Sequence, residues 1–145
     1  MHYRFIKVTS FYKTFLESYY DSNSEIVSES YDDQYKHLME QGYGYSNYFP
    51  NYLNQNYSIT GTELIHNALP LQNAWAKEHG YELSGNKLLF EQLKHYQPEI
   101  LFIQDSVNFN ASFIQKIRKE IGSLKLLMGH CCAPYNSESI KAFSQ

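Results

Sequence analysis

Two side chains that can exchange protons near neutral pH follow apolar segments of this sequence. Asp105 comes after the segment 100–103, and His130 comes after the segment 124–129. In such places a carboxylate or an imidazole can accept a proton from a substrate hydroxyl, and the histidine can also contact a phosphate. Each also has a structural alternative, because Asp105 could cap the next helix and His130 could bond to a neighbouring loop. The sequence therefore gives two candidate catalytic residues, Asp105 and His130.

Other polar and aromatic side chains occupy equivalent places after the predicted strands. The carboxyl ends of parallel strands meet at one edge of a sheet, and ligands of open α/β sheets bind outside that edge. This rule selects a set of candidate substrate-binding residues, which are Thr9, Ser10, Phe11, Tyr12, His66, Asn67, Gln104, Ser106, Cys131 and Pro134.

The motifs of several common enzyme classes are missing. The segment after the first predicted strand has neither the G-x-G-x-x-G spacing of dinucleotide-binding proteins nor the G-x-x-x-x-G-K-[ST] spacing of phosphate-binding loops. The chain has no G-x-S-x-G nucleophile elbow, and its six histidines form no H-E-x-x-H pair. These absences argue against oxidoreductases, NTPases, serine hydrolases and zinc proteases. We expect neither a cofactor nor a bound metal.

The elements that position these residues alternate between strand and helix. The predicted strands cover residues 5–10, 62–67, 99–105 and 124–129, and the predicted helices cover residues 12–20, 31–41, 71–79, 86–96, 111–121 and 137–143. Ser30 before two aspartates is typical of a helix start, and Gly122 is typical of a helix end. Such alternation implies right-handed crossovers and a mostly parallel sheet. We therefore predict an α/β fold, a Rossmann-like three-layer α/β/α sandwich.

Length and composition indicate one folded domain over residues 1–145. The chain is 43% hydrophobic and 17% aromatic, which is too apolar for a disordered segment. Its net charge is −3 and it has no basic run, so we expect no nucleic-acid partner. It has no apolar stretch of the length of a signal peptide or a membrane span, which favours a cytoplasmic protein. The adjacent Cys131 and Cys132 are expected to be reduced thiols.

An aromatic segment from Tyr43 to Tyr52 has two interpretations. Tyr48, Phe49 and Tyr52 are at helical spacing and can share one face of a helix. That face could pack on the sheet, or it could form a stacking surface for a sugar or another ring-bearing ligand. The sequence leaves both interpretations open.

Four segments together resemble a known family. They are Phe5-Ile6-Lys7-Val8-Thr9-Ser10-Phe11-Tyr12, Pro70-Leu71-Gln72-Asn73-Ala74-Trp75-Ala76, Pro98-Glu99-Ile100-Leu101-Phe102-Ile103-Gln104-Asp105, and the loop from Gly129 to Pro134. In these segments the chain resembles bacterial glycosyltransferases of the spore-maturation-protein-like group. The resemblance extends over nearly the whole chain, although its strand pattern recurs in many Rossmann-like domains.

The resemblance implies a GT-B architecture, in which two Rossmann-like domains face a cleft. The amino-terminal domain of such enzymes handles mostly the acceptor, and the carboxyl-terminal domain binds the nucleotide-sugar donor. The resemblance also implies that no metal is needed, because positive side chains and helix amino termini stabilise the leaving diphosphate. On this interpretation the chain is a truncated acceptor-side half, inactive without a missing carboxyl-terminal domain that binds the donor. The acceptor is unknown.

A second hypothesis is a stand-alone α/β module of the flavodoxin or receiver type. Such a module would bind a partner or a small ligand without catalysis. A receiver needs a pair of acids after its first strand, and Thr9 and Ser10 provide none.

Overall fold

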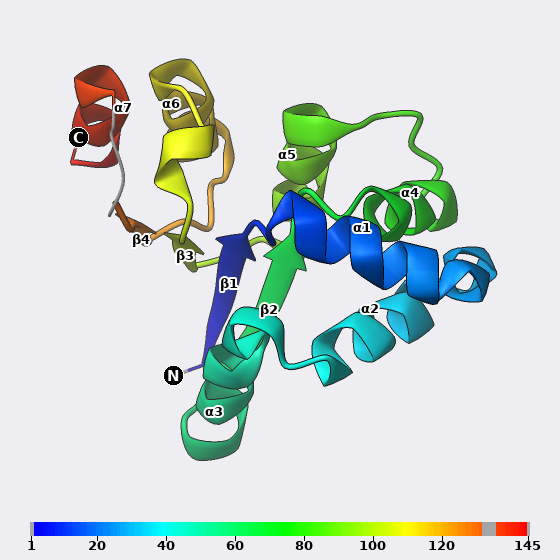
Figure 1. Ribbon diagram of the computed structural model, residues 1–145. Coiled ribbons are helices and arrows are strands. Elements are labelled where there is room, and N and C mark those ends of the chain that lie inside the picture. Colours follow the sequence, from blue (N-terminus) through cyan, green and yellow to red (C-terminus); the bar gives the residue numbers. More distant parts are fainter. Residues whose placement is uncertain (1, 132–135, 145) are drawn as a thin grey trace.

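A sheet of four parallel strands lies at the centre of the structure (Figure 1). The structure is a computed structural model that describes residues 2–131 and 136–144. In these two ranges the strands are β1 (Tyr3–Thr9), β2 (Ile59–Ile65), β3 (Ile100–Ile103) and β4 (Leu126–Gly129). Their order across the sheet is β2-β1-β3-β4, so β1 and β3 are the inner strands.

Helices connect each strand to the next. The connections contain α1 (Lys13–Ser22), α2 (Tyr31–Glu40) and α3 (Tyr48–Asn56) between β1 and β2, α4 (Leu69–Glu78) and α5 (Gly85–Tyr96) between β2 and β3, and α6 (Ala111–Glu120) between β3 and β4. A further helix, α7 (Ser137–Phe143), follows β4 and lies beside α6 (Figure 1). The predicted α/β class, with a parallel sheet flanked by helices in a Rossmann-like sandwich, is confirmed.

One face of the sheet packs against α5 and α6. Its side chains come from alternate strand positions, as the two-residue period of a strand requires. They are Ile6, Val8, Leu64, Leu101, Ile103 and Leu127, and they share one hydrophobic cluster with Leu89, Leu93, Ile114 and Ile117 of the two helices. This cluster holds the inner strands and therefore fixes the places where their carboxyl ends emerge.

The opposite face is covered over β1 and β2 but not over β4. Here α3 approaches β2 so closely that a Cβ atom at Gly61 would lie 3.0 Å from Cα of Pro50. In contrast, Leu126 and Met128 of β4 are 46% and 37% exposed. Parallel sheets are normally covered on both faces, so the uncovered part of β4 is unusual.

A buried ion pair lies on this second face, between the neighbouring strands β1 and β2. Nζ of Lys7 is 2.9 Å from Oε1 of Glu63, and the two side chains are 8% and 0% exposed. Burial raises the pKa of Glu63 to about 7, and the ammonium group of Lys7 opposes this shift. The other carboxylate oxygen of Glu63 has no hydrogen-bond partner among the described residues.

A second hydrophobic cluster joins α1, α2 and α4 and is centred on Trp75. The Trp75 ring is fully buried, and its Nε1 donates a hydrogen bond to the hydroxyl of Tyr96 at 3.2 Å. The ring of His79 stacks on it with centroids 3.9 Å apart. Leu16 and Tyr19 of α1 belong to the same cluster, so α1 and α4 are held side by side.

Side chains cap the amino termini of two of the helices, and the predicted helix start at Ser30 is confirmed. Ser30 caps α2, because its Oγ accepts a hydrogen bond from the backbone N–H of Asp33 at 3.2 Å. Asn110 caps α6 in the same way through the N–H of Phe113. In the described ranges, no helix is long and apolar enough to cross a membrane.

The predicted bounds of the second strand were wrong by a few residues. The strand covers Ile59–Ile65 and not residues 62–67, because it pairs with the whole of β1 from Tyr3 to Thr9. His66 and Asn67 therefore lie beyond the strand, in the loop before α4. This shift places both side chains at the carboxyl edge of the sheet.

Candidate functional site

The carboxyl ends of β1, β2 and β3 meet where the crossovers of the chain change direction. From β1 the chain moves to its neighbour β2, and it then passes β1 to reach β3 on the other side. Ligands of open α/β sheets bind at such a switch point. Ser10 follows β1, His66 follows β2 and Asp105 follows β3, and hydrogen bonds join Ser10 to each of the other two.

Asp105 fastens the loop after β3 to the loop after β1. Its Oδ2 accepts a hydrogen bond from the backbone N–H of Ser10 at 2.7 Å and another from the hydroxyl of Thr9 at 3.3 Å. Asp105 stands directly before a short 3-10 helix (Ser106–Asn108), but its side chain forms no capping hydrogen bond there. The carboxylate therefore organises the loop of β1 and does not cap the next helix.

Ser10 and His66 form a short contact between side chains at this edge. Oγ of Ser10 is 2.7 Å from Nε2 of His66, and Nδ2 of Asn108 donates a hydrogen bond to the same Oγ at 3.1 Å. The serine oxygen thus links three loops, one after each of β1, β2 and β3. No described residue forms a hydrogen bond with the second ring nitrogen of His66, Nδ1.

The surroundings of His66 favour its neutral form. Burial lowers the pKa of His66 below its ordinary value, and the negative charge of Asp105 opposes that shift. The fully buried ring of Phe109 lies 5.1 Å from the imidazole, centroid to centroid. A neutral imidazole has one nitrogen that accepts a proton, and a nearby carboxylate stabilises the imidazolium that results. The arrangement is suited to general-base chemistry on a hydroxyl group.

The other predicted residues after β1 and β2 have structural contacts. Asn67 bonds to both backbone groups of Phe11, accepting from its N–H at 3.0 Å and donating to its C=O at 2.7 Å. Thr9 and Phe11 are 2% and 4% exposed, so their side chains are not open to a ligand. Tyr12, in contrast, is 77% exposed.

The remaining predicted residues follow β3 and β4. Ser106 is buried, and its hydroxyl donates a hydrogen bond to the carbonyl of His130 at 2.7 Å. The side chain of His130 is exposed, while Gln104 and Cys131 are half-buried. Pro134 lies outside the described residues. The structure thus brings Ser10, His66 and Asp105 together and leaves His130 at the end of the edge strand β4.

A groove of about 700 Å³ opens beside His66 and Asn67. Its lining residues come from α1, the loop before α4, the start of α4 and the start of α5. Its size falls within the range of sites for small molecules. The groove is lined by Lys13, Leu16, Glu17, Tyr20, Asp21, His66, Asn67, Leu69, Pro70, Gly85 and Asn86.

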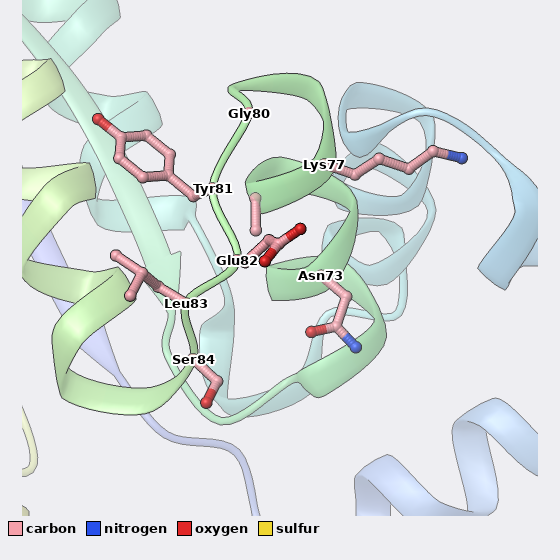
Figure 2. Close-up of a pocket in the computed structure, with 8 residues that line it drawn as sticks. Asn73, Lys77, Gly80, Tyr81, Glu82, Leu83 and Ser84 are labelled. Carbon is pink, nitrogen blue, oxygen red and sulfur yellow. The ribbon is translucent and has the colours of Figure 1, made fainter.

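A second hollow, of about 560 Å³, lies between α4 and the segment that leads to α5 (Figure 2). Figure 2 shows Tyr81 and Lys77 pointing to opposite sides, with Glu82 between them. The residues that line it include no histidine or cysteine. The first groove is therefore the better candidate for a reactive site.

The aromatic segment that could stack on a sugar is divided between two places. Tyr43 stacks on Phe15 of α1 with ring centroids 3.8 Å apart, so it belongs to the packing around α1. Tyr48 and Tyr52 of α3 are 58% and 54% exposed, and α3 covers the first half of β2, at the opposite end of the sheet from His66. These two tyrosines do not line the groove beside His66.

Several residues of the site were not selected from the sequence. Asn108 lies three positions beyond Asp105, and the rule that selected Asp105 would have found it if it had been extended through the loop. Leu16, Tyr20 and Leu69 line the groove from helices, and only the packing of α1 against α4 brings them together. No pattern in the sequence identifies such a wall.

Comparison of the chain with protein-family models, with characterised proteins and with solved structures finds no match. The site must therefore be interpreted from its own geometry. In the described part of the chain, no group of three or more histidine, cysteine, aspartate or glutamate side chains is arranged to hold a metal ion.

Proposed function

We propose that this chain is the acceptor-side domain of a glycosyltransferase that uses a nucleotide-sugar donor, and that His66 is its general base. The observation that carries the proposal is the contact of His66 with Ser10 beside Asp105, at the switch point of the sheet, where His66 also lines the groove. Sugar transfer to a hydroxyl requires a base at the acceptor oxygen. This contact does not identify the acceptor.

The proposed proton path uses both nitrogens of the imidazole. Nε2–H donates to Oγ of Ser10, which keeps the ring in place, and Nδ1 accepts the proton of the acceptor hydroxyl. The negative charge of Asp105 raises the pKa of His66, although the larger effect of burial lowers it. Asp105 therefore stabilises the imidazolium that forms when Nδ1 takes the proton. Sequence reasoning named Asp105 and His130 as bases, and the proposal gives Asp105 a positioning role instead.

The proposal assigns the donor to a second domain. A leaving nucleoside diphosphate needs cationic groups or free backbone N–H groups to stabilise its charge. Lys13 is the one lysine or arginine that lines the groove in the described part of the chain, and its Nζ is 3.5 Å from Oε1 of Glu17. A groove with one paired cation is better suited to an uncharged acceptor than to a diphosphate.

Calorimetric titration with a panel of nucleotide sugars tests this assignment. We would titrate this chain and a version extended through any coding sequence that follows Gln145. Binding by the extended protein alone, and sugar transfer that is lost in His66→Ala, would support the proposal. If neither protein binds a nucleotide sugar, the glycosyltransferase assignment is wrong.

One observation favours a second candidate, a flavodoxin-like module that binds without turnover. The strand order β2-β1-β3-β4 equals the first four positions of the 2-1-3-4-5 order of flavodoxin-like proteins, and it differs from the 3-2-1-4-5-6 order of dinucleotide-binding domains. Such a module would bind a ligand at the same switch point. Titration with flavin mononucleotide separates this candidate from the first, because an acceptor-side domain has no reason to bind it.

A further inference from the structure

The groove beside His66 is apolar along most of its length. Leu16 of α1, with Leu69 and Pro70 at the start of α4, forms its walls together with the ring of Tyr20. Burial raises the pKa of Tyr20 to about 12, so this hydroxyl carries no charge at neutral pH. An acceptor with an apolar body would bury more apolar surface against these four side chains than a free sugar would.

Leu69 is the most informative of these residues. Its side chain is 61% exposed although it begins a helix whose other leucine, Leu71, is fully buried. Isolated exposed leucines are common, but this one lines the same groove as His66, the residue proposed as the base. A ligand that contacts Leu69 therefore lies in the same groove as the polar side chains of His66 and Asn67.

The charges of the groove are arranged asymmetrically. Lys13, at the start of α1, is 3.5 Å from Glu17, so the two neutralise each other. Asp21, one turn beyond Glu17, is not in an ion pair with any described residue. The distance along α1 from Lys13 to Asp21 is about 12 Å at the rise of an α-helix. With one cation and two anions, the ionised side chains that line the groove have a net charge of −1, which disfavours an anionic ligand.

We infer that the groove binds an alcohol or phenol with an apolar body and no anionic group, whose hydroxyl lies at His66. This inference rests on the proposed function in one respect: the ligand is the sugar acceptor if the chain is the acceptor-side domain of a glycosyltransferase. The apolar body contacts Leu16 and Leu69, and any substituent that reaches Asp21 is neutral or cationic. Binding to the groove itself does not require a donor or a second domain.

Three probes test the selectivity of the groove in the wild-type chain. We would measure dissociation constants by calorimetry for 2-naphthol, for 2-naphthoate and for glucose. We expect 2-naphthol to bind at least tenfold more tightly than the other two. Equal binding of 2-naphthol and 2-naphthoate, or tighter binding of glucose, would overturn the inference, as would no binding of 2-naphthol.

A pair of matched variants locates the binding. Leu69→Ser removes an exposed apolar side chain from the groove, and Leu126→Ser removes an exposed one, 46% accessible, from β4. We expect Leu69→Ser to weaken 2-naphthol binding about tenfold and Leu126→Ser to leave it unchanged. Equal effects of the two variants would place the probe elsewhere and contradict the inference. Circular dichroism would check that both variants are folded.

The inference about the groove and the proposed function can fail independently of each other. Groove-dependent binding of 2-naphthol with no transfer from any nucleotide sugar would refute the glycosyltransferase and leave the ligand class intact. Transfer to free sugars, with no binding of 2-naphthol, would do the reverse.

Discussion

Oγ of Ser10 and Nε2 of His66 lie 2.7 Å apart, although 56 positions separate the two residues in the chain. Their contact depends on the pairing of β1 with β2, which sets Thr9 opposite Ile65 and so makes both loops begin at the same level. Asp105 reaches the same place because β3 pairs with the other side of β1. Three neighbouring strands thus each contribute one residue.

Replacement of His66 should remove the general base. In a protein that transfers sugar, His66→Ala should lower kcat by about 100-fold or more. The matched control is His95→Ala, since His95 is exposed and lies at the end of α5 away from the groove. Because the pKa of His66 is lowered, the acid limb of the wild-type rate profile should lie below pH 6.5. An equal loss in the two variants would exclude His66 as the base.

Asp105→Ala should destabilise the protein as well as the site. The change leaves the backbone N–H of Ser10 and the hydroxyl of Thr9 without their acceptor. We expect the free energy of unfolding to fall by about 1–3 kcal/mol, the usual cost of an unsatisfied buried donor. Urea denaturation would measure it, with Asp21→Ala as the exposed control. A melt identical to the wild type would show that these two bonds contribute nothing.

The buried pair of Lys7 and Glu63 should tolerate joint replacement better than single replacement. Lys7→Met alone leaves a fully buried carboxylate without its counter-ion, and we expect a loss of about 3–5 kcal/mol. The double variant Lys7→Met with Glu63→Leu replaces the pair by apolar side chains and should be close to the wild type in stability. Chemical denaturation of both variants gives the comparison. A double variant as unstable as the single one would mean that the pair is required for folding.

The same glutamate should make stability depend on pH. Its pKa is about 7 in the folded chain and near 4.5 when unfolded, so the folded state binds more protons between these values. Stability should therefore fall as pH rises from about 4.5 to about 7, by an amount of the order of 3 kcal/mol from this group. The double variant of Lys7 and Glu63 lacks the group. Parallel pH dependences in the two proteins would refute the assignment.

Gly61→Ala should be more costly than an alanine at a glycine in open space. A Cβ atom at Gly61 would lie 3.0 Å from Cα and O of Pro50, so α3 would have to move away from β2. We expect a loss of about 1–3 kcal/mol. Gly122→Ala is the control, because no atom lies within 4 Å of its Cβ position. Thermal melting would compare the stability of the two variants. Similar melting temperatures would show that α3 can move away from β2 without a measurable loss of stability.

Local signals in the sequence were sufficient to predict most elements of the fold. Two examples are the helix start at Ser30, which stands before two aspartates, and the strand in the apolar segment 100–103. Each signal depends on a few neighbouring residues and not on the rest of the chain. The carboxyl-edge rule likewise selected Ser10, His66 and Asp105, because it requires only that strands be parallel.

The roles of these residues could not be predicted in the same way. Strand order decides which loops become neighbours, and several orders satisfy the same right-handed crossovers. The order β2-β1-β3-β4 brings His66 and Asp105 to opposite sides of Ser10 and leaves His130 on the edge strand. The bounds of β2 were misplaced for a related reason, since Ile59–Thr60–Gly61 becomes a strand by pairing with β1.

The uneven cover of the sheet has a consequence for the order in which the protein opens. β1 has a paired strand on each side and helices on both faces, while β4 has one described neighbour and one uncovered face. Backbone amide hydrogens exchange with solvent through local opening, which is easiest where buried contacts are fewest. The amides of β4 should therefore exchange early and those of β1 last. Ser10 directly follows β1 and forms hydrogen bonds with both His66 and Asp105. The loop that contains Ser10 therefore stays attached to the most slowly exchanging strand while β4 opens locally.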